Sequence, residues 1–166
     1  MVLKSMGLPE RELIRILSLQ GRAMIPVSRP VYQIVCLCKS PIRLPRRSPL
    51  GRFVDLGCQY MDTWPATFLC INCGRVSEYS VDSVQDYRVT LTDPSERLPD
   101  LWRIDFECAH ENCGRMNTIY TSYSAGFPEA AVKSAVFRKL LTLQCSAGHS
   151  FEVNERTLRK MEPFEW

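Results

Sequence analysis

Seven of the eight cysteines lie in short pairs or close to a histidine, at spacings that suit metal binding. The clearest motif is Cys70-Ile-Asn-Cys73, which is followed directly by Gly74. Two thiolates separated by two residues can hold one metal ion from a tight turn, because backbone N–H groups in such a turn point at the sulfurs. The glycine allows the chain to reverse after the second ligand. The motif therefore predicts a turn that supplies two metal ligands.

Three other segments carry two potential ligands at short spacing. Each could form a turn that presents both side chains to one ion. Two of them have a glycine beside the second ligand, whereas the third has only one residue between its ligands and is unusually tight. The pairs are Cys108 with Cys113, Cys145 with His149, and Cys36 with Cys38.

The segments that begin at Cys70 and Cys108 form an internal repeat. In both, the second cysteine precedes Gly-Arg and then a polar, β-prone stretch that carries a tyrosine. The intervals also agree, since residues 39–69 and residues 114–144 each place 31 residues between one ligand pair and the next. The order of the pairs is reversed, because the tight pair comes first in one half and the Cys-His pair comes last in the other. This pattern favours two related metal sites.

A tetrahedral zinc site needs four ligands, almost always as two facing pairs. The simplest assignment uses all four pairs and gives two zinc ions, which we favour. A rival assignment combines the two Cys-Gly-Arg motifs at a single zinc ion and leaves Cys145 and His149 unused. The favoured ligands are Cys36, Cys38, Cys70 and Cys73 for one ion and Cys108, Cys113, Cys145 and His149 for the other.

These paired turns resemble those of zinc ribbons and zinc-finger-like proteins, in which two β-turn knuckles clamp an ion between short hairpins. The resemblance covers the ligand pairs and the strands beside them. It implies metal binding and no particular role, because zinc ribbons serve many unrelated functions. The intervals of 31 residues exceed the roughly 15–20 residues of a compact site, so inserted strands or loops are expected.

Two further residues compete for a place in these sites. His110 lies between Cys108 and Cys113. It is expected to be a solvated turn residue or a hydrogen-bonding neighbour of a ligand. Cys58 stands apart from every pair and is expected to be a packed or surface thiol, since free cysteine behaves as a small apolar residue.

The composition is that of a folded protein in a reducing compartment. Hydrophobic residues make up 45% of the 166 residues, so a core can form. No apolar run approaches the ~20 residues that span a bilayer, and charged residues such as Glu10 and Arg15 interrupt the apolar stretch that a secretory signal would need. These features predict a cytoplasmic protein without a membrane segment, where clustered cysteines more often hold metal than form disulfides.

The charge is unevenly distributed. The chain has a formal net charge of +3, which divides into +7 for residues 1–61 and −4 for residues 62–166. Thiolate-bound zinc lowers the total, so a globally basic nucleic-acid-binding protein is not indicated. A basic loop that spans 39–52 could contact phosphates or an acidic partner, or could be a solvated loop that offsets thiolate charge. Its cations are Lys39, Arg43, Arg46, Arg47 and Arg52.

The pattern predicts a mainly β (β-rich α+β) fold with two zinc-ribbon-like knuckle pairs joined by short strands. Residues 1–30 are expected to form a separate segment, helical around 9–21 or flexible, and 31–166 a zinc-binding domain with subsites 31–80 and 102–153. A helix is expected near 128–138 because Pro128 precedes an alanine-rich stretch. Asn154–Met161 is expected to be a closing helical turn.

The functional prediction is a non-enzymatic structural zinc protein that mediates protein interactions. A catalytic zinc site keeps one position open, and the sequence offers only two histidines and no HExxH motif. The alternative is a nucleic-acid-binding zinc ribbon that uses the 39–52 loop. A weaker alternative is a thiol-disulfide redox protein, for which a CxxC pair would begin a helix.

Overall fold

The structure is a computed structural model, and it describes residues 26–44, 64–91 and 98–163. Ten strands, one 3-10 turn and one α-helix are found in these ranges. They are β1 (Val27–Val35), β2 (Pro41–Leu44), β3 (Ala66–Leu69), β4 (Val76–Tyr79), η2 (Val81–Ser83), β5 (Gln85–Leu91), β6 (Asp100–Glu107), β7 (Met116–Tyr123), α3 (Glu129–Lys139), β8 (Thr142–Gln144), β9 (Ser150–Glu152) and β10 (Leu158–Pro163).

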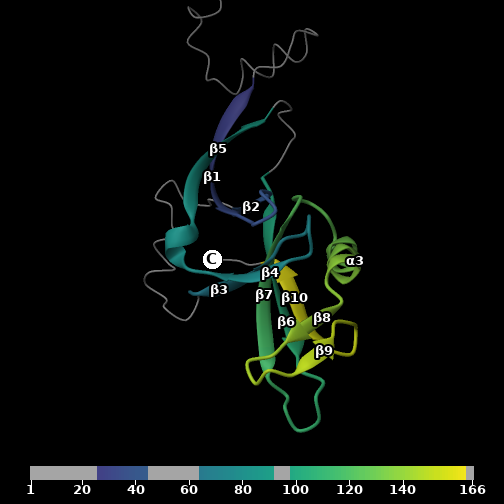
Figure 1. Ribbon diagram of the computed structural model, residues 1–166. Coiled ribbons are helices and arrows are strands. Elements are labelled where there is room, and N and C mark those ends of the chain that lie inside the picture. The colour runs from purple at the N-terminus through teal and green to yellow at the C-terminus, as the bar shows by residue number, and fades with distance from the viewer. Residues whose placement is uncertain (1–25, 45–63, 92–97, 164–166) are drawn as a thin grey trace, which may run out of the picture. The chain divides into compact units, whose positions relative to one another are not determined.

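The strands form three sheets (Figure 1). The largest has the order β10-β6-β7-β3-β4, and all of its neighbours are antiparallel except β3 and β7, which run parallel. A three-stranded sheet has the order β2-β1-β5, and β8 pairs with β9 alone. The larger of two compact units spans 30–87 and 97–166; the smaller one holds, among the described residues, 26–29 and 88–91.

The five-stranded sheet of the larger unit contributes residues to two hydrophobic cores. Alternate residues of β6 enter two different cores, as the period of two in a strand requires. Trp102, Ile104 and Phe106 join one core with residues of α3, β8 and β9, whereas Leu101 joins the other core with residues of β1 and β2. Strand β6 therefore carries apolar side chains on both faces at Leu101 and Trp102, and its other apolar residues alternate with Arg103 and Asp105.

Helix α3 occupies the stretch for which the sequence predicts a helix. It begins after Pro128, whose fixed φ suits the start of a helix. Val132, Ala135 and Val136 are buried and Arg138 lies in the last turn, where a cation is favourable. The helix packs its apolar side onto the core that contains Phe106.

The predicted fold class included a short helix near the N-terminus, and this prediction is wrong. The fold is β-rich with α3 as the one α-helix of the described residues, and the segment nearest the N-terminus in those ranges is strand β1. Strand β1 begins at Val27, four positions before residue 31, where the predicted zinc-binding domain begins, and it pairs with β2 and β5. The positions of the expected helix, 9–21, lie outside the described residues.

The predicted closing helical turn is also only partly present. The N–H groups of Thr157 and Leu158 both donate to the carbonyl of Asn154, which makes a single turn. The chain then continues as β10, which pairs with β6. Leu158 and Met161 pack against the core that surrounds α3, and that tertiary contact favours a strand over a helix.

Candidate metal centres

Cys36, Cys38, Cys70 and Cys73, here called the first cluster, come from two hairpin turns. The turn between β1 and β2 supplies Cys36 and Cys38, and the turn between β3 and β4 supplies Cys70 and Cys73. One ligand atom from each of the four lies within 4.8 Å of the others, so this cluster could hold a metal ion.

The turn after β1 explains how a Cys-x-Cys spacing can work. The N–H of Cys36 donates to the carbonyl of Ser40 at 3.0 Å, and the N–H of Lys39 donates to the carbonyl of Cys36 at 2.8 Å. Lys39 has a positive φ of 72°, a conformation that L-residues adopt at a cost. This closed five-residue turn brings the side chains of Cys36 and Cys38 into the same cluster despite the single residue between them.

The turn after β3 requires glycine at position 74 for its backbone conformation and for a close contact. Its N–H donates to the carbonyl of Cys70 at 2.8 Å, and its φ is +78°. A Cβ at this position would also lie 2.7 Å from the carbonyl oxygen of Lys139, at the end of α3. The Lys139 Nζ in turn donates to the carbonyl of Asn72 at 2.9 Å. The turn is therefore held against the helix end as well as by its own hydrogen bonds.

Two sulfur–sulfur distances in the first cluster match those of a tetrahedral zinc site. The Sγ atoms of Cys36 and Cys73 are 3.7 Å apart, as are those of Cys38 and Cys70. A regular tetrahedron with zinc–sulfur bonds of about 2.3 Å has sulfur–sulfur edges of about 3.8 Å, whereas a disulfide bond is about 2.05 Å long. The thiols are therefore free, and their spacing is one that could accommodate a shared metal ion.

Local hydrogen bonds make the thiols of the first cluster unequal. Hydrogen bonds from the hydroxyl and the backbone N–H of Ser40 lower the pKa of Cys38 to about 6. Burial raises the pKa of Cys70 to about 12. The N–H of Arg75 donates to the Cys73 sulfur at 3.5 Å. Because metals bind thiolates, an exposed Cys38 is ready to bind at neutral pH, and Cys70 needs the positive ion to lose its proton.

Cys108, Cys113, Cys145 and His149, here called the second cluster, come from two other hairpin turns. Cys108 and Cys113 lie in the turn between β6 and β7, and Cys145 and His149 lie in the turn between β8 and β9. Their ligand atoms also lie within 4.8 Å of one another, so this cluster too could hold a metal ion. The Sγ atoms of Cys113 and Cys145 are 3.9 Å apart.

His149 carries a nitrogen that suits a metal. Its Nδ1 is buried and has no hydrogen-bond partner among the described residues. A buried polar atom is rarely left unpaired in a folded protein, and a bound metal ion would satisfy it. Burial acts to raise the pKa of Cys145, but hydrogen bonds from the N–H groups of His149 and Ala147 and from the thiols of Cys108 and Cys113 together lower it. Both observations fit a site with three thiolates and one imidazole.

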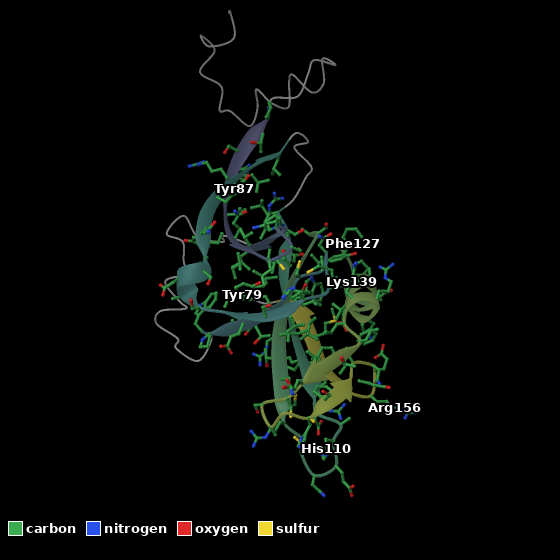
Figure 2. The ribbon with its side chains drawn as sticks, in the orientation of Figure 1. Tyr79, Tyr87, His110, Phe127, Lys139 and Arg156 are labelled. Atoms are coloured by element: carbon green, nitrogen blue, oxygen red, sulfur yellow. The ribbon has the colours of Figure 1, made fainter. Side chains whose placement is uncertain are left out.

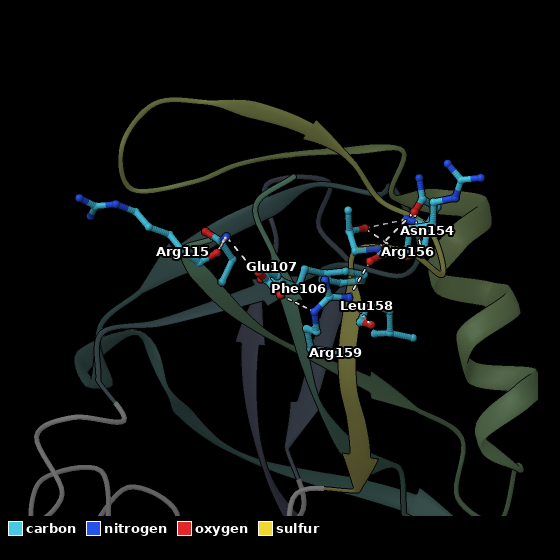
Figure 3. Close-up of polar contacts among 9 residues, drawn as sticks. Phe106, Glu107, Arg115, Asn154, Arg156, Leu158 and Arg159 are labelled. Atoms are coloured by element: carbon cyan, nitrogen blue, oxygen red, sulfur yellow. Dashed lines mark hydrogen bonds and ion pairs between the residues drawn. The ribbon is translucent and has the colours of Figure 1, made fainter. Parts of the chain in front are cut away.

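Polar contacts fix the chain that follows β9 beside the turn of Cys108 (Figure 3). Arg159 forms an ion pair with Glu107, the residue before Cys108, and donates from Nη1 to the carbonyl of Arg156 at 2.6 Å. The side chain of Asn154 accepts from the N–H of Arg156 at 2.9 Å. The ion pair connects β10 with β6 at the end of the sheet that carries the second cluster, and the other two bonds order the chain before β10.

The two clusters use the same five-residue turn for one of their ligand pairs. In the second, the N–H of Cys145 donates to the carbonyl of His149 at 2.9 Å, and the N–H of Gly148 donates to the carbonyl of Cys145 at 2.9 Å. This pattern matches the one from Cys36 to Ser40, including a positive φ of 85° at Gly148 in the place of Lys39. The second ligand stands at the third position of one turn and at the fifth of the other.

The rival pairing of the two Cys-Gly-Arg turns is not what the structure shows. Among the described residues, the ligand atoms gather in the two groups that the favoured assignment joins. The Cys70–Cys73 pair also lies in a turn between two strands, whereas a thioredoxin-like pair begins a helix.

The remaining residues singled out in the sequence are only partly placed. Lys39 is exposed beside the first cluster, and Arg43 is half-buried on β2. His110 is exposed in the turn between β6 and β7 and lies on the ring of His149. Cys58 and the other three cations of the basic loop, Arg46, Arg47 and Arg52, lie outside the described residues.

Several supporting residues gave no usable signal in the sequence. Ser40 and Asn72, whose side chains form a 2.8 Å hydrogen bond, connect the two turns of the first cluster. The Arg115 side chain does the same in the second, where it donates to the Ser146 hydroxyl at 3.0 Å. The Gly-Arg repeat in the sequence includes Arg115, but it did not indicate that Ser146 would be the hydrogen-bond partner of this arginine.

Comparison with protein-family models, with curated proteins and with solved structures gave no significant match to this sequence. Among the described residues, no helix has the length and apolar character needed to cross a membrane. The functional argument therefore rests on the geometry of the two clusters.

Proposed function

We propose that this chain is a non-enzymatic protein whose fold is held by two structural zinc ions and whose role is to bind another protein. The observation that carries the proposal is the spacing of the ligand atoms. Two sulfur–sulfur distances of 3.7 Å in the first cluster match the edge of a zinc–thiolate tetrahedron. The unpaired Nδ1 of His149 supplies the independent support for the second cluster.

The donor sets favour zinc over other metals. Thiolate and imidazole ligands select soft or borderline ions, and tetrahedral sulfur sites hold zinc or iron. A set of three cysteines and one histidine is a standard structural zinc set. We expect Cys36, Cys38, Cys70 and Cys73 to hold one ion and Cys108, Cys113, Cys145 and His149 to hold the other.

Closed coordination supports a structural role. Each cluster offers four protein ligands, whereas a catalytic zinc ion keeps a position open for water or substrate. Each ion would also join two different sheets, because the turns of the first cluster belong to the three-stranded and five-stranded sheets and those of the second to the five-stranded and two-stranded sheets. Zinc binding would then supply folding free energy.

The first cluster also presents an apolar residue for a partner. Leu37, between two ligands, is 72% exposed and lines a hollow with Gly74 and Arg75. Gly74 faces the end of α3. Leu141, two residues after the last residue of this helix, is 70% exposed. A leucine on a turn fixed by metal loses little conformational freedom on binding. Cations at Lys39, Arg75 and Lys139 offset the charge of a four-thiolate zinc site, so they do not require a nucleic acid.

The structural role is tested by removing the metal. A strong chelator should abolish the dispersed amide NMR spectrum of the purified protein, and added zinc should restore it. A spectrum that stays dispersed after both ions are removed would contradict the structural role.

The binding role is tested by photocross-linking in cells from position 37. We expect a discrete protein adduct from that position and none from the exposed Glu129, which serves as the matched control. Equal cross-linking from both positions would contradict a specific protein surface. Cross-linking to nucleic acid, with affinity that falls steeply with salt, would favour the nucleic-acid alternative instead.

A further inference from the structure

His110 stacks on the ring of His149. The ring centroids are 3.9 Å apart and the ring planes are inclined by only 9°. His110 belongs to the turn between β6 and β7, whereas His149 belongs to the turn between β8 and β9. Figure 2 shows His110 at the turn end of the larger sheet. The stack is thus a contact between the two turns that form the second cluster.

The position of His110 is fixed at both its backbone and its side chain. Its carbonyl accepts from the N–H of Cys113 at 3.1 Å, so the residue is bound to a metal ligand of its own turn. Its Nδ1 lies 3.2 Å from the carbonyl of Glu111. Because a carbonyl only accepts hydrogen bonds, this contact places a proton on Nδ1 and removes that nitrogen from metal binding.

The parallel geometry also argues against His110 as a ligand through its other nitrogen. An imidazole binds metal in the plane of its ring, along the nitrogen lone pair. An ion in the plane of His149 would lie off the nearly parallel plane of His110. The group of ligand atoms that lie within 4.8 Å of one another contains His149 and not His110.

The second cluster is open to solvent on this side. His110 lines a hollow together with Cys108, Cys113 and Asn112. The hollow leads to the half-buried Cys113, whereas Cys108 is buried. The ring of His110 therefore lies on a side of the cluster that solvent can reach.

We propose that His110 is a positioning residue, which holds the His149 imidazole in its metal-binding orientation by stacking and slows release of the second metal ion. This inference rests on the proposed function, because it needs zinc at the second cluster. Loss of the stack leaves the four ligands in place and frees the imidazole to rotate away. We expect release to become about two- to tenfold faster, the factor typical of one aromatic pair.

The test compares three proteins loaded with two zinc ions: wild type, His110→Ala and His110→Phe. The rate of zinc transfer to a coloured chelator is measured, and the first cluster serves as the internal reference. We expect one of the two ions to leave faster in His110→Ala, the other to be unchanged, and His110→Phe to restore the wild-type rate because phenylalanine can also stack. Equal rates in wild type and His110→Ala would overturn the proposal.

The visible spectrum of cobalt-substituted protein provides the second readout. We expect all three proteins to show the same mixture of four-thiolate and three-thiolate, one-imidazole sites. A changed ligand set in His110→Ala would show that His110 is a ligand and would overturn its positioning role. Wild-type protein that binds fewer than two ions would instead contradict the proposed function, so the two failures are distinct.

Discussion

The carbonyl oxygen of Lys139 lies 2.7 Å from the place that a Cβ would take on Gly74. This contact joins the end of α3 to the turn that supplies Cys70 and Cys73. The turn also needs the positive φ of 78° at Gly74. Glycine is therefore favoured here for two reasons: the carbonyl of Lys139 lies too close for a side chain, and the backbone is left-handed.

Gly74→Ala should therefore destabilise the protein by about 2–4 kcal/mol, which combines the cost of a left-handed alanine with that of moving a backbone carbonyl. The matched control is Gly126→Ala, since Gly126 has a φ of 82° but no atom within 4 Å of its Cβ position. It should lose only about 1–2 kcal/mol. Chemical denaturation with both metals bound measures the difference. Equal losses in the two variants would show that the contact with Lys139 is unimportant.

Single ligand substitutions should each remove one of two metal ions. Cys73→Ser and Cys113→Ser remove ligands from different clusters. Ser134→Ala, which changes an exposed residue of α3 that belongs to neither cluster, is the control. Metal analysis after dialysis should give one zinc ion per chain for each cysteine variant and two for the control. Full occupancy in Cys113→Ser would mean that this cluster does not bind zinc through Cys113.

The common turn of the two clusters leads to a prediction about ligand exchange. His149→Ser should lose the second ion, and the pair of changes Ala147→Cys and His149→Ser should regain it. The double variant places cysteine at the third position and serine at the fifth, as Cys38 and Ser40 are placed in the first turn. Cobalt spectra should then show two four-thiolate sites. A double variant that binds only one ion would show that the two turns, despite their matching hydrogen bonds, do not present a ligand at the third position in the same way.

Much of this arrangement could be predicted from the sequence, because its signals lie within a few residues of one another. The ligand pairs and the trailing Gly74 mark turns because thiolate spacing and a positive φ are short-range requirements. Helix α3 was expected from Pro128 and the alanines that follow, which are also local signals. The mainly β body agrees with the β-prone stretches that follow Cys73 and Cys113, which are again local signals.

Other features depend on contacts that are distant in sequence. The contact of Gly74 with Lys139, the stack of His110 on His149 and the parallel pairing of β3 with β7 all join residues from separate segments. Asn154 has the character of a helix cap, yet the chain after it becomes β10 because β6 offers an edge to pair with. No local pattern contains that information.

The pKa of Cys38 predicts how acid affects the first cluster. Hydrogen bonds from Ser40 lower this pKa from 9.0 to about 6 in the metal-free fold. A lowered pKa stabilises the folded form above the unfolded value, so this contribution is complete above pH 9 and is lost as the pH falls from about 9 to about 6. Ser40→Ala should raise the pKa of Cys38, and metal release from the first cluster should then begin at a higher pH.

A pH titration monitored by zinc release measures this effect. Ser134→Ala, in which an exposed serine of α3 is changed, should keep the wild-type midpoint. An unchanged midpoint in Ser40→Ala would show that the Ser40 hydrogen bonds do not govern the Cys38 thiolate.

The central claim is that each of the two clusters holds one zinc ion. Native mass spectrometry of the purified chain, combined with metal analysis, tests it most directly. We predict a mass excess that corresponds to two zinc ions per chain, lost together with the folded charge-state distribution when a strong chelator is added. A folded chain that carries one zinc ion, a different metal or none would contradict the account.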